Sequence, residues 1–196
     1  DEPDGSAKFI VNVLQNEKVK NAVHALLDRD GLILGICNGF QALVKSGLVP
    51  YGRIMTLDDK APTLFRNNIN LHISTVVQTR VASNNSPWLA HEKVADVYSI
   101  AVSHGEGKFV ATDEMVEELF AKGCVAYQYC DENGVTSNDS HYNVNGSVCA
   151  IEGITSFDGH VLGKMGHSER FSDGLYKNVE GNYDMMMFES AVEYFK

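Results

Sequence analysis

The first fifty residues change their hydrophobic spacing twice. Residues 7–14 and 17–28 carry apolar side chains three and four positions apart, which predicts two amphipathic helices. Residues 31–36 form a short apolar run bounded by glycine, which predicts a strand buried on both faces, as in a parallel sheet. Residues 41–46 return to helical spacing. A strand, a tight turn and a helix are therefore predicted around Cys37.

The middle and the end of the chain are richer in β-branched residues. Their partial alternation with polar residues predicts strands at residues 69–81 and 94–102. Residues 113–122 predict a helix, because acidic side chains lie in its first turns and a glycine follows it. Further strands are predicted at residues 124–129, 148–155 and 160–165, and a last helix at residues 184–195. Alternating strands and helices are typical of a layered α/β domain.

Three local features refine this α/β prediction. Residues 69–102 are expected to form an antiparallel element at the side of the sheet. The Asp-Glu-Asn-Gly sequence at residues 131–134 predicts a hairpin turn rather than a cation-binding loop. Residues 157–159, Phe-Asp-Gly, are predicted to join the last two strands.

The composition is that of an ordinary globular domain. The 196 residues are 44% hydrophobic and 21% charged, and 16 basic against 26 acidic residues give a formal charge of -10. The basic residues are scattered, so nucleic-acid binding is disfavoured. No apolar run reaches the roughly 18 residues of a membrane span. Four irregularly spaced cysteines suit neither a disulfide framework nor a zinc site, which favours a reducing, cytoplasmic location.

The strongest local motif lies in the predicted turn around Cys37 and reads Gly35-Ile36-Cys37-Asn38-Gly39. A G-x-C-x-G sequence between strand and helix has the form of a nucleophile elbow, a strained turn that presents the thiol at the carboxyl end of a strand. The helix N-terminus favours a thiolate, and the Asn38 N–H can donate to an oxyanion. A buried structural cysteine fits the same residues, so the motif alone leaves both interpretations open.

A thiol nucleophile needs a general base, and two histidines follow predicted strands. His104 lies in a polar, glycine-rich segment. His167 is followed two positions later by Glu169, whose carboxylate can bind the outer imidazole nitrogen and stabilise the imidazolium. A lone histidine is more often structural. The His-x-Glu pair, together with an elbow cysteine, favours His167 as the base.

Other kinds of site find no support in the sequence. The zinc-protease, P-loop, dinucleotide-binding and EF-hand motifs do not occur, so we expect no metal, ATP or dinucleotide site within this chain. The remaining histidines are interpreted as structural or surface residues: His24, His72, His91, His141 and His160.

Four motifs together carry a family resemblance: G-I-C-N-G-F-Q at residues 35–41, S-H-G-E-G at 103–107, N-V-N-G-S at 143–147 and G-H-S-E-R-F at 166–171. They resemble the class I, or triad, glutamine amidotransferases, and more closely the glutaminase domains of the phosphoribosylformylglycinamidine synthases (formylglycinamide ribonucleotide amidotransferases) of purine biosynthesis. The first and last motifs suit many triad amidotransferases, whereas the two middle ones look specific to the purine enzymes.

The resemblance implies a fold and a set of site residues. The fold would be class I glutamine amidotransferase-like (flavodoxin-like), a layered sheet with helices on both faces. Cys37 would attack the side-chain amide of glutamine to form a thioester and release ammonia, with His167 as base and then acid and Glu169 orienting it. The residues expected at the oxyanion and around bound glutamine are Asn38, Gln41, Ser103, His104, Gly105 and Glu106.

The resemblance also implies partners. Ammonia would pass through a channel to an ATP-dependent synthetase domain of the same polypeptide, which converts formylglycinamide ribonucleotide to the amidine. ATP and magnesium are expected in that domain, and no cofactor is expected in residues 1–196. Nucleic acid and membranes are not expected as partners.

Two features depart from the family pattern. Such families often have proline before the catalytic histidine, where this chain has Met165-Gly166, and we expect this to alter backbone stiffness more than chemistry. Residues 1–6 resemble the stretch after a glycine-rich loop that supplies the second oxyanion N–H. We therefore expect that loop and the first strands to be missing, residues 1–196 to be the C-terminal glutaminase domain of a longer synthetase, and this piece alone to be weakly active or inactive.

Two alternative functions stay open from the sequence. One is a non-catalytic glutaminase-like domain that only forms an interface. The other is a cysteine hydrolase of the related α/β peptidase type, which can share an elbow cysteine. The presence of all three triad residues disfavours the first, and the His-x-Glu pair near the end of the chain disfavours the second.

Overall fold

The computed structural model describes residues 7–196, and the expectation for residues 1–6 lies outside them. The helices are α1 (Ala7–Leu14), α2 (Glu17–Leu27), α3 (Asn38–Ser46), α4 (Leu48–Tyr51), α5 (Asp113–Ala121) and α6 (Met187–Tyr194), with 3-10 turns η1 (Pro87–Leu89) and η2 (Val148–Ala150). The strands are β1 (Ile33–Ile36), β2 (Thr63–Phe65), β3 (Ile73–Val81), β4 (Val97–His104), β5 (Lys108–Val110), β6 (Val125–Tyr129), β7 (Ile151–Thr155) and β8 (Val161–Lys164). Within residues 7–196, no helix has the length and apolar character needed to cross a membrane.

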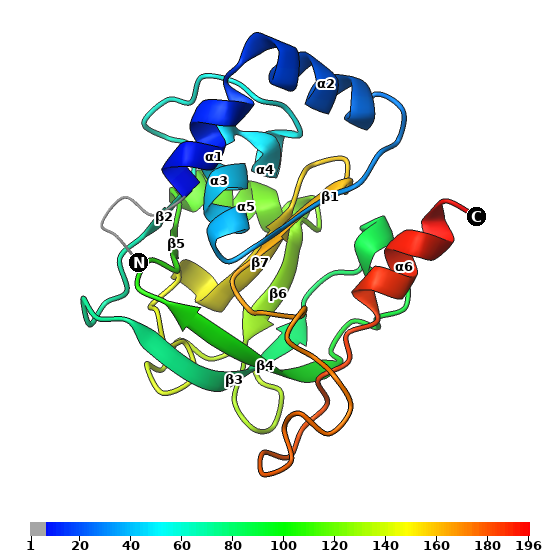
Figure 1. Cartoon of the computed structure of the whole chain (residues 1–196). Helices are drawn as coiled ribbons and strands as arrows, with labels where there is room; N and C mark the ends of the chain where they lie inside the picture. Colours follow the sequence, from blue (N-terminus) through cyan, green and yellow to red (C-terminus); the bar gives the residue numbers. More distant parts are fainter. Residues whose placement is uncertain (1–6) are drawn as a thin grey trace.

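A curled six-stranded sheet organises the fold. Its strands run in the order β1-β8-β7-β6-β3-β4, and β2 pairs with β5 in a separate two-stranded sheet. The sheet bends so strongly that the β3–β4 pair crosses below the other strands (Figure 1). The backbone N–H of His167, just beyond β8, donates to the carbonyl of Ala101 in β4 over 2.8 Å. The curl therefore brings the outer strand β4 back to the end of β8.

Helices cover both faces of this sheet, as the resemblance implied. On one face, α3, α4 and α5 contribute Phe40, Leu48 and Leu119 to one buried cluster. On the other face, α6 packs against η1, and Met187 joins Trp88 in a second cluster. Neighbouring strand residues point to opposite clusters, since Val161 belongs to the first and Leu162 to the second. The predicted layered α/β fold is thus confirmed.

The prediction of a parallel sheet holds only at its edge. β1 pairs with β8 in parallel, whereas the other strand pairs of this sheet are antiparallel. The expected burial of residues 31–36 on both faces is only partly met, because β1 is an outer strand and Ile33, Leu34 and Ile36 are half-buried. The β3–β4 pair is antiparallel as expected, but Arg80 of β3 pairs with Gln128 of β6, so the pair continues the main sheet.

Two segments differ locally from their predictions. The strand predicted at residues 148–155 starts only at Ile151, because Cys149 and Ala150 adopt positive φ angles of 49° and 55° and form a turn. The short strands β2 and β5 were not predicted at all, since three residues are too few to show an alternation. The hairpin turn at residues 131–134 is confirmed: the Asp131 N–H donates to the Val135 carbonyl over 2.9 Å, and Gly134 has a φ of 74°.

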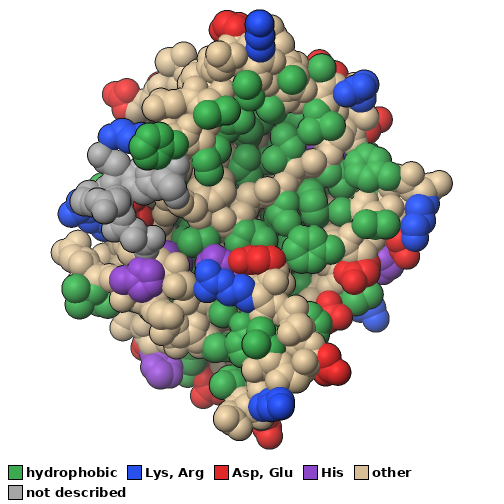
Figure 2. Space-filling model, viewed as in Figure 1, with side chains coloured by type: hydrophobic (Ala, Val, Ile, Leu, Met, Phe, Trp, Pro, Cys, Tyr) green, Lys and Arg blue, Asp and Glu red, His purple; other side chains and the backbone are tan. Residues whose placement is uncertain are grey.

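Hydrophobic side chains gather on one face of the molecule, between α1 and β1 (Figure 2). α1 leaves Phe9, Ile10 and Val13 with 76%, 42% and 58% of their surfaces exposed. β1 is an outer strand of the sheet. This apolar face adjoins the turn that carries Cys37.

Candidate active site

Cys37 occupies the strained turn that the sequence predicted. It lies between β1 and α3 with φ 53° and ψ -105°, a conformation that side chains rarely adopt. Gly35 makes the turn possible, because a Cβ there would lie 2.4 Å from the Leu43 side chain and 2.7 Å from the carbonyl carbon of Gly39. A Cβ on Gly39 would meet no atom within 4 Å. Close packing therefore requires a small residue at Gly35 and leaves room for a side chain at Gly39.

The Cys37 thiol is half-buried and faces the end of β4. Its Sγ lies 3.7 Å from the carbonyl oxygen of Ser103, to which it can donate a weak hydrogen bond. Burial raises the pKa of Cys37, while the Asn38 backbone N–H and the Arg170 charge act in the opposite direction. The thiol is thus the resting form at neutral pH. The Asn38 N–H at the helix N-terminus favours the thiolate, as expected, but burial outweighs it, so a base must take the proton.

His167 lies at the same edge of the sheet as Cys37. Because β1 and β8 are parallel neighbours, both residues follow the carboxyl ends of adjacent strands, and the Cys37 N–H donates to the Lys164 carbonyl over 2.8 Å. His167 Nδ1 lies 2.5 Å from Glu169 Oε1. An ionised carboxylate only accepts hydrogen bonds, so Nδ1 carries the proton and Nε2 presents a lone pair. Nε2 is buried and has no hydrogen-bond partner within residues 7–196.

Glu169 and Arg170 sit at the mouth of the site. Glu169 is 44% exposed, and its carboxylate lies 3.7 Å from the Arg170 guanidinium. The positive charge of Arg170 also acts on the Cys37 thiol. A carboxylate bound to the imidazole suits a group that stabilises the imidazolium formed when His167 takes a proton.

Asn38 and Gln41, both predicted near the substrate, have different surroundings. The backbone N–H of Asn38 is directed towards Cys37, while its side-chain oxygen accepts from the Ala7 N–H over 3.2 Å and so joins α1 to α3. Gln41 is 6% exposed, and its amide donates to the Glu106 carbonyl over 2.6 Å. Gln41 therefore holds the 103–107 loop.

The first residue of that loop (residues 103–107) lies against the Cys37 thiol. The Ser103 carbonyl contacts Cys37, and the Ser103 hydroxyl lies 3.1 Å from His72 Nε2. Further along, the Glu106 carboxylate lies 3.9 Å from Arg66. The loop thus presents the Ser103 carbonyl to the half-buried thiol, while beyond Gly105 the Glu106 carbonyl binds Gln41 and the Glu106 carboxylate faces Arg66.

His104 points into the protein from the same loop. It is 1% exposed, and its Nδ1 lies 3.2 Å from the side-chain oxygen of Asn67. Burial lowers the pKa of His104 to about 4, and the nearby His72 and His167 add to this effect. A Cβ on Gly107 would lie 2.5 Å from the His104 ring. His104 is therefore a neutral residue packed beneath the loop.

A buried polar network supports the 103–107 loop. The sequence did not predict this network as a whole. Asn67 donates to the His104 carbonyl over 2.8 Å and accepts from the Gly107 N–H over 3.1 Å. Asn145 donates to the Gly107 carbonyl over 2.7 Å and to the Tyr129 hydroxyl over 2.9 Å. The N-V-N-G-S motif had signalled the Asn145 side of this network, whereas a single asparagine such as Asn67 gives no signal in sequence.

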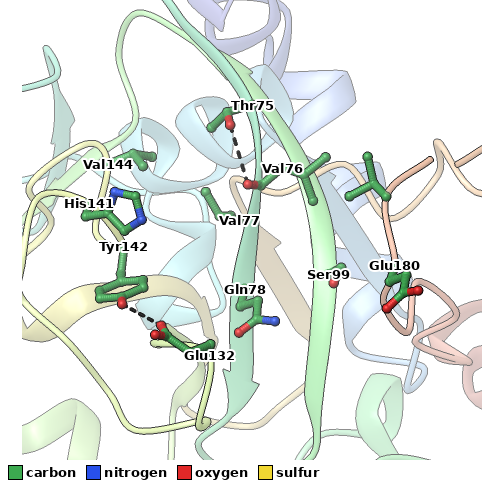
Figure 3. Close-up of a pocket in the computed structure, with 11 residues that line it drawn as sticks. Thr75, Val76, Val77, Gln78, Ser99, Glu132, His141, Tyr142, Val144 and Glu180 are labelled. Carbon is green, nitrogen blue, oxygen red and sulfur yellow. Dashed lines mark hydrogen bonds between the residues drawn. The ribbon is translucent and has the colours of Figure 1, made fainter.

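Two other features bear on where a ligand could bind. Within residues 7–196, no group of three or more His, Cys, Asp or Glu side chains is arranged to hold a metal ion. A groove of about 450 Å³ lies on β3 and β4 (Figure 3). It is lined by Thr75, Val76, Val77, Gln78, Ser99, Glu132, His141, Tyr142, Val144, Val179 and Glu180. None of the predicted triad residues contributes to it.

Comparisons with known proteins agree on one family. Residues 1–195 match the family model described as a CobB/CobQ-like glutamine amidotransferase domain. The chain is 36% identical over 178 residues to the phosphoribosylformylglycinamidine synthase subunit PurQ of Rhodopseudomonas palustris (strain HaA2), covering 91% of this chain and 70% of that protein. It is 35% identical over 171 residues to the PurQ subunit of Acaryochloris marina, covering 87% and 66%.

A solved structure extends the comparison to three dimensions. The structure of PurLQS from Thermotoga maritima contains a chain that superposes with a TM-score of 0.69 at 26% identity, covering 97% of this chain and 72% of that one. The present chain spans about two thirds of the length of the curated relatives that it matches.

Proposed function

Because the chain belongs to the CobB/CobQ-like glutamine amidotransferase family, we propose that it is the glutaminase of a phosphoribosylformylglycinamidine synthase, acting in purine biosynthesis. The observation that carries this proposal is the elbow thiol of Cys37 at the same sheet edge as the His167–Glu169 pair. The relatives named as PurQ subunits support the choice of synthase.

The proposed reaction begins at the resting thiol. His167 Nε2 takes the Cys37 proton as Sγ attacks the side-chain carbonyl carbon of glutamine, and the Asn38 N–H donates to the developing oxyanion. The imidazolium, stabilised by Glu169, then returns the proton to the leaving nitrogen. Ammonia departs and a γ-glutamyl thioester remains. Water, deprotonated by His167, hydrolyses the thioester to glutamate and restores the thiol.

The ammonia needs an acceptor site on another domain. We propose a synthetase as the partner, on the same polypeptide, where ATP and magnesium activate formylglycinamide ribonucleotide. The matching PurLQS structure and the name of the PurQ subunits support a synthetase partner. The four cysteines are free thiols, which supports the proposed cytoplasmic location.

Substitution of Cys37 in the full-length protein tests this function. Cys37→Ala should abolish glutamine-dependent synthesis, because no thioester can form, while synthesis from added ammonia continues. Both rates are measured as formation of the amidine product. Cys124→Ala serves as the matched control, since Cys124 is buried in the hydrophobic core and should leave both rates close to wild type. Equal loss of the two activities in Cys37→Ala would contradict the proposal.

Chemical labelling of the cysteines distinguishes the proposed glutaminase from the two alternative functions. A glutamine-mimicking electrophile should modify Cys37 alone, as mapped by peptide mass, and glutamine should protect it. An interface domain without catalysis would show no glutamine-protected labelling. A peptidase-type cysteine hydrolase would hydrolyse peptide substrates and ignore glutamine. Modification at Cys124, Cys130 or Cys149 instead of Cys37 would overturn the assignment of the nucleophile.

A further inference from the structure

A buried ion pair lies directly behind the turn that carries His167. Lys164 ends β8 and Glu152 lies in β7, and both side chains are completely buried with 3.6 Å between Nζ and Oε1. Both reach the residue before His167. The Gly166 N–H donates to Glu152 Oε1 over 2.5 Å, and Lys164 Nζ donates to the Gly166 carbonyl over 3.1 Å.

The same ammonium group also holds the residue after His167. Lys164 Nζ donates to the Ser168 hydroxyl over 2.9 Å. The backbone is thus held at Gly166 and at the His167 N–H, which donates to Ala101, and the Ser168 side chain is held on the other side of the histidine. With its flanking residues fixed, the imidazole has few directions left in which to point.

We propose that Lys164 and Glu152 are positioning residues that hold the 166–168 turn, so that His167 Nε2 faces the Cys37 thiol. This role rests on the proposed function, because it gives the ion pair its purpose in proton transfer. Neither side chain is exposed to substrate. Their effect on catalysis passes through His167.

The contacts of Lys164 and Glu152 with the 166–168 turn act as a clamp, and the flexibility of Gly166 explains why the turn needs one. A glycine is the least restricted residue in the chain, so the turn before His167 has no stiffness of its own. A proline, which such families often have here, would fix φ but could not donate to Glu152. A Cβ at Gly166 would lie 2.6 Å from Ile100 and 2.9 Å from Glu152 Oε1. Glycine at position 166 therefore leaves room for the Glu152 carboxylate. The hydrogen bond to that carboxylate then restricts the backbone of the turn.

The charges in this buried region balance. The Tyr127 hydroxyl donates to Glu92 Oε1 over 2.7 Å, and burial raises the pKa of Glu92 to about 8, so Glu92 is neutral at pH 7. One cation, Lys164, then faces one anion, Glu152. Apolar residues of similar volume often stabilise a core as well as or better than a buried ion pair. The contacts to Gly166 and Ser168 supply a reason for keeping this pair.

The test removes both charges together, because a single substitution leaves an unpaired buried charge that endangers folding. In the full-length protein, the double variant E152M/K164M should fold, keep the KM for glutamine within about threefold, and lower kcat for glutamine hydrolysis about tenfold or more, since misplacement of a catalytic group is costly. E152Q/K164M retains an acceptor for the Gly166 N–H and should lose less. E92Q is the matched control, with kcat within about twofold, because it alters the same buried region without touching the turn.

Nitrogen-15 NMR of His167 provides a readout that general destabilisation does not move. Wild type should show one tautomer protonated at Nδ1, and E152M/K164M should show averaging of the two tautomers with a changed pH profile of kcat. Should wild type fail to hydrolyse glutamine, the proposed function fails, while the tautomer still tests the clamp. Wild-type kcat together with a wild-type tautomer in folded E152M/K164M would overturn the inference. If that variant does not fold, the same result in E152Q/K164M would overturn it.

Discussion

At the scale of single residues, two buried histidines near strand ends differ in the group that binds their Nδ1. His104 is buried with Asn67 as its partner, and burial lowers its pKa to about 4. His167 is largely buried too, but Glu169 binds its Nδ1 and leaves Nε2 free to accept a proton. The partner of the ring, more than its burial, determines which histidine can act as a base.

The charge of Glu169 can be tested apart from its hydrogen bond. Glu169→Gln keeps an acceptor for His167 Nδ1 but loses the charge that stabilises the imidazolium, so kcat for glutamine hydrolysis should fall about tenfold to a hundredfold. KM should change little. Steady-state kinetics on the full-length protein measure both. Glu118→Gln, an exposed carboxylate paired with Lys122, is the control. Wild-type kcat in Glu169→Gln would show that the carboxylate only orients the ring.

At the scale of elements, the strand–turn–helix around Cys37 follows closely from sequence. β1 and α3 lie where the apolar spacing predicts them, and the turn between them carries the cysteine. The strand predicted at residues 148–155 shows the limit, because two residues with positive φ angles convert its beginning into a turn. The hydrophobic pattern of a segment indicates whether that segment is buried. It does not report backbone conformation at a single residue.

The two glycines of the elbow provide a matched pair for measuring strain. Gly35→Ala places a Cβ against the backbone of Gly39, which cannot move away, and should lower the free energy of unfolding by about 1–3 kcal/mol. Gly39→Ala enters open space near the start of α3 and should be neutral or stabilise by up to about 1 kcal/mol. Urea unfolding measures both. Equal destabilisation would show that the close packing at Gly35 does not set the turn.

At the scale of the whole molecule, the curl of the sheet assembles the site. Cys37 and His167 follow strands that are neighbours in the sheet, whereas Ser103 comes from β4 at the opposite end of the strand order. The sheet bends so that β4 crosses below the other strands (Figure 1), and the Ser103 carbonyl contacts the Cys37 thiol. The site is therefore a property of the curled sheet.

The buried carboxyl of Glu92 should give the whole molecule a pH-dependent stability. In the unfolded chain this carboxyl loses its proton near its ordinary pKa, about 4.5, while in the folded protein it keeps the proton up to about pH 8. The folded state binds the extra proton between these values, so the contribution of Glu92 is full below pH 4.5 and is lost as the pH rises to 8. This loss should be on the order of 3–5 kcal/mol.

Denaturant unfolding between pH 5 and pH 8 checks this expectation. Glu92→Gln keeps an acceptor for the Tyr127 hydroxyl but cannot ionise, so its stability should fall less with pH than that of wild type. Parallel pH profiles of the two proteins would show that Glu92 does not titrate as its burial indicates.

The sequence by itself determined the helices other than the short α4, most strands, the elbow at Cys37 and the pairing of His167 with Glu169. These features depend on residues within a few positions of one another, and local spacing encodes such contacts. Tertiary structure alone decided the antiparallel order of most strands, the burial of His104, the support of the loop by Asn67 and the clamp of Lys164 and Glu152 on Gly166. Each of these depends on contacts between different strands or loops. Their register depends on how the whole sheet curls and packs, which no local pattern records.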